Sequence, residues 1–176
     1  MATNLEFIKS AECTSDVATL SVTDCFSDKY DNYRVVLKVN EVSAEAATEI
    51  RLLDSSSNAL STSHYQTSHR FMADNASYSN GGGSGYQDQA KWQYTMYNEG
   101  SVGGFSIYEI FSPYSDSQYT WMHYQMTSHY VASSTSTSLA RAGIGVYNQT
   151  TRITGIQAYQ PQTRLTNAKL IVYGIL

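Results

Sequence analysis

The chain has 176 residues and a formal net charge of −4, with 11 Lys and Arg against 15 Asp and Glu. Its basic residues are scattered singly, so no basic stripe can neutralise a phosphate backbone, and nucleic acid is excluded as an expected partner. No apolar run approaches the roughly 20 residues of a membrane helix, and the N-terminus has neither the charged nor the apolar region of a signal peptide. We therefore expect no membrane partner and synthesis in a cytoplasm.

Ser, Thr and Tyr dominate the composition, with 24, 17 and 15 residues. Charged residues make up only 15% of the chain, against about 25% in an average soluble domain. Tyr, Thr, Val and Ile favour pleated sheets, whereas the strong helix formers Glu, Lys and Leu are sparse. The sequence predicts an all-β fold, and its length suits one domain with a full hydrophobic core.

The N-terminal segment carries two short apolar patches. Leu5, Phe7 and Ile8 indicate either a first strand or an arm that docks onto a neighbouring protein. Residues 17–22 indicate a second short strand, bounded by Ser and Asp.

No linker along the chain is rich enough to divide it in two. The N-terminal segment contains both cysteines, Cys13 and Cys25. In a chain without a signal peptide, free buried thiols are favoured over a disulfide, although the sequence does not decide between them.

The next segment predicts strands joined by turns. Residues 33–40 alternate apolar and polar side chains, which is typical of a strand with one face in the core. Residues 41–48 are helix-friendly but too short for a helix, and we expect a loop or a single turn. Residues 50–53 then begin a strand, residues 54–58 turn, and residues 59–66 return, which predicts a second hairpin.

The alternating pattern is lost from residue 67 to residue 89. This segment contains the glycine-rich run 81–85. No Gly-Lys-Ser/Thr follows the run and no helix pattern opens after it, so a phosphate-binding loop is excluded. We expect a long loop, of the kind that is functional or is ordered by a partner.

The stretch from Gly104 to Met126 predicts a hairpin at the centre of a sheet. Ser112-Pro113 interrupts two alternating flanks, since proline cannot donate a hydrogen bond to a sheet. Alternation places two sets of side chains on opposite faces, and both sets contain large residues. One set is Phe105, Ile107, Glu109, Phe111, Trp121, His123 and Gln125; the other is Ser106, Tyr108, Ile110, Met122, Tyr124 and Met126.

Further strands are expected on both sides of this hairpin, with a Ser/Thr-rich turn at 133–138. They are predicted at residues 92–96, 127–131, 144–147, 153–159 and 168–176. Strands thus recur about every ten to twelve residues, as in a sandwich of antiparallel hairpins. We predict an antiparallel β-sandwich that is jelly-roll-like, with about nine or ten strands; an immunoglobulin-like sandwich is the alternative.

No group of residues has the pattern of a catalytic, cofactor or metal site. His123 and His129 share a face but lie about 20 Å apart along a strand, and His64 and His69 lack a completing ligand set. Glu109 shares a face with large apolar residues, so we expect an Arg or Lys on a neighbouring strand, or water at a sheet edge, to pair with it. We therefore predict no enzyme, no cofactor and no metal.

Aromatic residues in or near loops are the remaining candidates for contacts. Exposed tyrosines suit both sugar stacking and protein interfaces. The candidates for interaction or glycan contact are Tyr78, Tyr86, Trp92, Tyr114 and Tyr119. Trp92 and Trp121 have an alternative role, in which both tryptophans are buried and anchor the hydrophobic core instead of contacting a partner.

Four motifs together resemble those of a known group of proteins. They are Tyr-Asp-Asn-Tyr-Arg-Val-Val-Leu at 30–37, Ile-Arg-Leu-Leu-Asp at 50–54, Thr-Gly-Ile-Gln at 154–157 and Ala-Lys-Leu-Ile-Val-Tyr-Gly-Ile at 168–175. The chain resembles β-sandwich virion proteins of tailed bacteriophages, especially phages of aquatic bacteria. The resemblance spans residues 30–176, and its motifs are structural, so it carries over no site residues. It implies a division of the chain into residues 1–29, an N-terminal arm with short strands and a candidate docking segment, and residues 30–176, the main β-sandwich domain.

The resemblance implies a structural protein displayed on a virion. The implied roles are a capsid decoration or cement protein, or a subunit of a tail fibre or related appendage, after assembly in the host cytoplasm. Its implied partners are other virion proteins, such as major capsid or tail proteins, and further copies of itself, with a trimer as one candidate state. The alternative is a carbohydrate-binding receptor adhesin that contacts a host surface glycan. A polysaccharide hydrolase, with Glu109 and Asp116 as its acids, is a third hypothesis.

Overall fold

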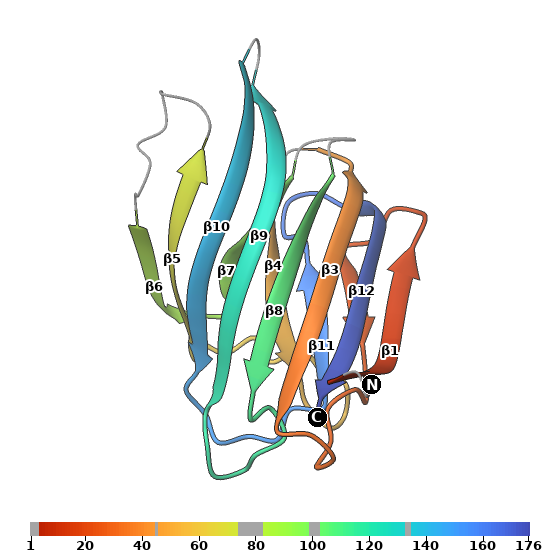
Figure 1. Cartoon of the computed structure of the whole chain (residues 1–176), viewed down its shortest axis with the longest axis vertical. Coiled ribbons are helices and arrows are strands. Elements are labelled where there is room, and N and C mark those ends of the chain that lie inside the picture. The colour runs from red at the N-terminus through yellow and green to blue at the C-terminus, as the bar shows by residue number, and fades with distance from the viewer. Residues whose placement is uncertain (1–3, 45, 74–82, 99–102, 133–134) are drawn as a thin grey trace.

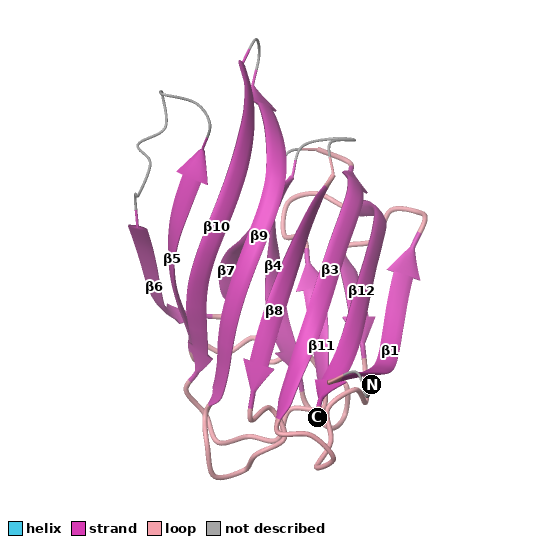
Figure 2. Cartoon of the chain, viewed as in Figure 1, coloured by secondary structure: helices cyan, strands magenta, loops and turns pink. Residues whose placement is uncertain are grey.

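A computed structural model describes residues 4–44, 46–73, 83–98, 103–132 and 135–176. The described residues form twelve strands in two antiparallel sheets, and Figure 2 shows that strands and loops account for all of them. In spatial order the eight-stranded sheet contains β1 (Leu5–Cys13), β12 (Leu165–Ile175), β3 (Asn32–Val42), β8 (Gly104–Phe111), β9 (Thr120–Ala132), β10 (Thr135–Tyr147), β5 (Tyr65–Ala73) and β6 (Gly83–Gln89). The four-stranded sheet contains β2 (Thr19–Val22), β11 (Gly155–Tyr159), β4 (Ala46–Leu53) and β7 (Trp92–Asn98).

The two sheets stack as the layers of a sandwich, which confirms the predicted fold class. Figure 1 looks onto the eight-stranded sheet, with β4, β7 and β11 behind it. Among the described strands, three consecutive pairs lie in the same sheet: β5–β6, β8–β9 and β9–β10. Every other connection between consecutive strands crosses from one sheet to the other. Such crossing is typical of jelly rolls. Within the described part of the chain, no helix is long and apolar enough to cross a bilayer.

Large aromatic side chains fill the space between the sheets. Trp92, Tyr33, Tyr65, Tyr108 and Tyr124 are all at most 2% exposed. The Tyr65 hydroxyl joins the layers: it accepts a hydrogen bond from the Leu52 amide at 3.0 Å and donates one to the Leu60 carbonyl at 2.8 Å. Because both backbone groups are satisfied by one buried side chain, Tyr65 fixes the position of β5 against β4.

The predicted central hairpin is confirmed. β8 and β9 pair from Gly104 with Ser128 to Phe111 with Trp121, and they are the fourth and fifth strands of the eight-stranded sheet. Tyr108, Ile110 and Met122 point into the core, so the opposite set of side chains faces outward.

The described residues form more strands than the nine or ten expected, and two regions without apolar alternation belong to strands. Residues 67–89 contain most of β5 and all of β6, where we expected a loop; the inward side chains of β5 include Thr67 and His69, so no hydrophobic alternation marks it. Residues 135–138, expected as a turn, begin β10, where Thr is compatible with a sheet and the backbone pairs with β9. The part of the expected loop from 74 to 82 lies outside the described residues.

The expected hairpin over residues 50–66 is confirmed only beside its turn, where Leu53 and Ala59 form one antiparallel bridge and the Leu60 amide donates to the Leu52 carbonyl at 2.9 Å. β4 begins at Ala46, four residues before the predicted start, and it pairs with β11 and β7 in the four-stranded sheet. β5 begins only at Tyr65 and belongs to the other sheet. The turn at 54–58 is present, with the Asp54 carboxylate accepting from the Ser56 amide at 2.8 Å, but it starts a crossing between layers.

The described residues of the N-terminal arm belong to the sandwich. β1 pairs with β12 along its length and β2 pairs with β11, so the boundary after residue 29 matches no break in the sheets. Docking by this arm stays a prediction. Cys13 and Cys25 are free thiols, as favoured from the sequence.

Candidate functional site

The eight-stranded sheet has one covered face and one face turned away from the four-stranded sheet, which we call the outer face. Register aligns its outward side chains in rows that run across β3, β8, β9, β10 and β5. The four rows are Lys38, Phe105, Thr127, Ala140 and Met72; Val36, Ile107, Gln125, Ala142 and Arg70; Arg34, Glu109, His123, Ile144 and Ser68; and Asn32, Phe111, Trp121, Val146 and Gln66. Figure 1 views the molecule from this side.

Exposed apolar side chains concentrate on the outer face. Seven large hydrophobic residues are exposed in the described part of the chain, and five of them point outward from this sheet. They are Phe7 (57%), Met72 (57%), Phe105 (48%), Trp121 (50%) and Ile144 (56%). Single exposed hydrophobic residues are ordinary, but their gathering on one face of a sheet favours an interaction surface.

One end of the outer face is hollowed. The hollow has a volume of about 990 Å³ and extends over five neighbouring strands, from β3 to β5. Its floor and walls include Val36, Phe105, Ile107, Ala140 and Met72. Because these side chains are mostly apolar, the hollow suits apolar side chains of a partner better than a charged ligand.

The centre of the outer face is polar. Arg34 and Glu109 lie opposite each other on β3 and β8, and their side chains form an ion pair at 2.5 Å. This confirms the cationic partner expected for Glu109. A second cavity of about 230 Å³ lies here, lined by the pair together with Ile107, His123 and Gln125.

The hydrolase hypothesis required Glu109 and Asp116 to work together. Asp116 lies in the loop between β8 and β9, where it pairs with Arg152 at 2.8 Å, and Glu109 pairs with Arg34. Each carboxylate thus has its own guanidinium partner. In the part of the chain that the structure describes, no three His, Cys, Asp or Glu side chains group as metal ligands.

The predicted aromatic contact residues do not form one site. Trp92 is fully buried, and its indole Nε1 donates to the Val146 carbonyl at 3.2 Å, so its proposed contact with a glycan is wrong. Tyr86 lies on β6 and stacks on His69 with ring centroids 6.0 Å apart. Tyr114 and Tyr119 lie in the loop between β8 and β9, and Tyr78 lies outside the described residues.

The candidate docking residues point in different directions. Phe7 is outward and packs edge-on against Tyr173, with centroids 6.1 Å apart. Ile8 packs against the core, and Leu5 is partly buried opposite Ile175. Of these three, Phe7 and Leu5 belong to the outer face, where Leu5 lines a hollow with Arg34 and Glu109.

Sequence reasoning missed the main exposed residues of the outer face. Trp121 was a candidate core anchor, but it is half exposed. The exposure of Ile144 and Met72 could not be predicted from the sequence, because a strand with large side chains on both faces does not reveal which face another sheet covers. One signal for the exposure of Trp121 was available: it shares a strand face with the polar residues His123 and Gln125.

Buried titratable groups lie on the covered side. Burial raises the pKa of the Cys25 thiol to about 12. Burial, together with the nearby Arg141 charge, lowers the pKa of His69 to about 4. Neither group contributes to the outer face.

The fold places this chain in the class of two-layer antiparallel β-sandwich proteins. No family model and no curated protein matches its sequence. Among solved structures, it is similar to an alginate lyase of polysaccharide lyase family 14 from Aplysia kurodai, with 6% identity, a TM-score of 0.39, and coverage of 97% of this chain and 99% of that one. It is also similar to an endo-β-1,4-glucuronan lyase from Trichoderma reesei, with 9% identity, a TM-score of 0.26, and coverage of 95% and 79%. At such low scores, neither similarity bears on what this chain does.

Proposed function

We propose that this chain is a non-enzymatic structural protein of a bacteriophage particle, which assembles with further copies of itself through the outer face. The observation that carries the proposal is the concentration of exposed Phe7, Met72, Phe105, Trp121 and Ile144 on one sheet face. Exposed to water, these side chains favour aggregation; covered by a partner, they stabilise an assembly.

The composition of the outer face supports a protein partner. Interface cores are enriched in aromatic residues, Met and Arg and depleted in other charged residues. The outer face shares the aromatic, Met and Arg part of this pattern, with Trp121, Phe105 and Met72 among its exposed residues and the Arg34–Glu109 pair near its centre. Arg34 and Glu109 side chains remain 38% and 32% exposed, so they can also pair with charges across an interface.

The size of the outer face fits a stable complex between copies. Eight strands at about 4.8 Å spacing and four rows at about 6.8 Å give a face of roughly 34 Å by 20 Å, or about 700 Å² per copy. A standard interface buries about 800 Å² per partner. Covering this face with a second copy therefore reaches the scale of a specific interface.

The virion assignment is supported by the sequence motifs. Their residues Tyr33, Leu37, Leu52, Ile156 and Leu170 are all buried. They build β3, β4, β11 and β12, so the motifs account for the sandwich, and the outer face is a separate feature of this chain.

Mass photometry of purified protein tests the assembly directly. We expect oligomers of the wild-type chain, and a shift to monomers in the variants Ile144→Lys and Phe105→Lys, which place a charge at exposed positions of the outer face. Leu176→Lys is the matched control, because Leu176 is 71% exposed but lies outside the rows, and it should leave the oligomer unchanged. A monomeric wild type, or equal dissociation by all three variants, contradicts the proposal.

The assignment to a virion needs a separate test. In a reconstruction of the whole particle, density for this sandwich should be present, with neighbouring copies in contact through β8, β9 and β10. Particles without such density contradict the virion part of the proposal and leave assembly in solution to be decided by mass photometry.

A further inference from the structure

A second hollow lies at the opposite end of the molecule from the large apolar one. Three loops build it: the β2–β3 loop, the β8–β9 loop and the β10–β11 loop, which meet at the lower end of the view in Figure 1. Its volume is about 440 Å³, within the range of about 300 to 1,000 Å³ of small-molecule sites.

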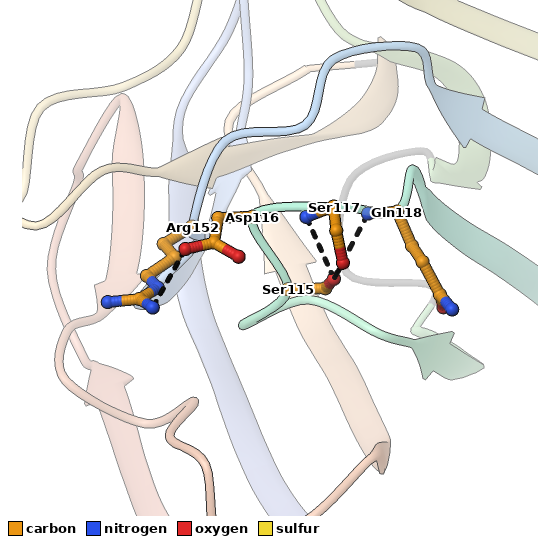
Figure 3. A network of polar contacts seen from close by, with 5 residues as sticks. All are labelled: Ser115, Asp116, Ser117, Gln118 and Arg152. Carbon is orange, nitrogen blue, oxygen red and sulfur yellow. Dashed lines mark hydrogen bonds and ion pairs between the residues drawn. The ribbon is translucent and has the colours of Figure 1, made fainter.

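The three loops are fixed to one another before any ligand binds. The Ser112 amide donates to the Asp31 carbonyl at 2.8 Å, and the Ile153 amide donates to the Pro113 carbonyl at 2.8 Å. Figure 3 shows the Arg152 guanidinium facing the Asp116 carboxylate, with 2.8 Å between nitrogen and oxygen. A site held in this way loses little conformational freedom on binding.

The lining of this loop hollow is polar and aromatic, without an aliphatic side chain. Besides three serines it contains Tyr30, and the groups that a ligand would meet are Asp28, Asp31, Tyr114, Gln118 and Arg152. The Gln118 Oε1 accepts from the Ser112 hydroxyl at 3.1 Å, so the amide nitrogen remains as a donor. In the part of the chain that the structure describes, the carboxylates of Asp28 and Asp31 have no hydrogen-bond or ion-pair partner.

The chemistry of this lining excludes several kinds of ligand. Anions are disfavoured, because two carboxylates face one guanidinium that Asp116 already partly neutralises. A metal ion lacks a ligand set, since no three candidate side chains group together among the described residues. An apolar ligand would leave the carboxylates and the amide without partners.

A neutral ligand rich in hydroxyl groups satisfies every part of the lining. Sugar hydroxyls donate to Asp28 and Asp31 and accept from Gln118 and Arg152. The Tyr114 ring, which has the Arg152 guanidinium 5.5 Å from its centroid, offers an aromatic surface to the C–H groups of a sugar ring. We propose that this loop hollow binds a neutral saccharide unit.

The loop hollow and the outer face share no lining residue, so this inference goes beyond assembly and does not depend on it. An assembly that covers the outer face leaves the loops at the lower end available. The chain would then combine a face for assembly with a site for a surface glycan.

Saturation-transfer difference NMR with neutral mono- and disaccharides of glucose, galactose, mannose and N-acetylglucosamine tests the site on the full chain. We expect transfer from the protein to at least one of these sugars, with a dissociation constant on the order of 1 mM. The variants Asp31→Ala and Gln118→Ala should weaken that binding about tenfold each, as expected for one lost hydrogen bond to a hydroxyl. Both positions are exposed, so the fold should tolerate the changes.

Tyr114→Ala and Tyr119→Ala form a matched pair from the same loop, since Tyr114 lines the hollow and Tyr119 does not. Loss of binding in Tyr114→Ala with retention in Tyr119→Ala supports the site. Absence of transfer to every sugar overturns it, as does binding that persists in both Asp31→Ala and Gln118→Ala. Mass photometry of the same variants should show unchanged oligomers, which separates this result from the test of assembly.

Discussion

Replacing Tyr65 with Phe removes one oxygen atom from the place where the two sheets are joined. The hydroxyl is fully buried, accepts from the Leu52 amide at 3.0 Å and donates to the Leu60 carbonyl at 2.8 Å. Tyr65→Phe keeps the ring and its edge-on contact with Trp92, with centroids 5.5 Å apart. The variant therefore isolates the two hydrogen bonds from the packing of the ring.

The expected loss of stability follows from the two backbone groups left without a partner. Each buried, unsatisfied group costs about 1 to 3 kcal/mol, and loss of the buried hydroxyl offsets part of this, so we expect a total of about 3 kcal/mol. In a chain of this size such a loss lowers the melting temperature by about 6 to 12 °C.

Urea unfolding and calorimetry measure this effect, with Tyr173→Phe as control. Tyr173 is a partly exposed outward residue whose ring contacts Phe7. No hydrogen bond of its hydroxyl is found within the described residues. Its change to Phe should alter the free energy of unfolding by less than about 0.5 kcal/mol. A loss below about 1 kcal/mol for Tyr65→Phe, or equal losses for both variants, would refute the role of Tyr65 as the link between the sheets.

Three further predictions concern packing and buried groups. A Cβ at Gly145 would lie 2.7 Å from the Trp92 indole nitrogen, so Gly145→Ala should lower the free energy of unfolding by about 1 to 3 kcal/mol. Gly85 has open space around it, so Gly85→Ala should have nearly the wild-type stability in urea unfolding. The pKa of His69 in the folded chain is lowered to about 4, so below pH 6.5 the unfolded state binds more protons than the folded state. The free energy of unfolding should therefore fall between pH 6.5 and pH 4, by at most about 1.4 kcal/mol per pH unit. A His69→Gln variant with the same pH slope as wild type would contradict this. Burial raises the pKa of Cys25 to about 12, so its thiol should react with a thiol reagent at neutral pH only after unfolding; rapid labelling of the folded chain would contradict its burial.

The sequence predicted the sandwich where apolar alternation was strong. In β3, β8 and the first half of β9, large apolar side chains point inward. For these strands, the sequence correctly predicted which side chains share a face. β5 was missed because Thr67 and His69 occupy two of its inward positions, and these polar residues give no hydrophobic period. β4 was found, and its predicted return is limited to the Leu53–Ala59 bridge. Its main partners, β11 and β7, were not predicted, since pairing depends on which layer a strand enters.

The candidate sites were harder to predict than the strands. Alternation separates Trp121 from Met122 but does not show which face a second sheet covers. Trp92 and Trp121 therefore could not be distinguished, although one is fully buried and the other is 50% exposed. The loop hollow joins Asp31, Tyr114 and Arg152, which lie far apart in the chain and meet only after the sandwich has formed.

The two tryptophans give the most direct measurement of the central claim, which is that a second copy covers the outer face. The chain contains only Trp92, fully buried, and Trp121, half exposed on the outer face. In iodide quenching of tryptophan fluorescence across a range of protein concentrations, we predict that Trp121 is quenched at high dilution and becomes protected as the oligomer forms. Quenching of Trp121 that stays constant while the mass increases would contradict assembly through the outer face.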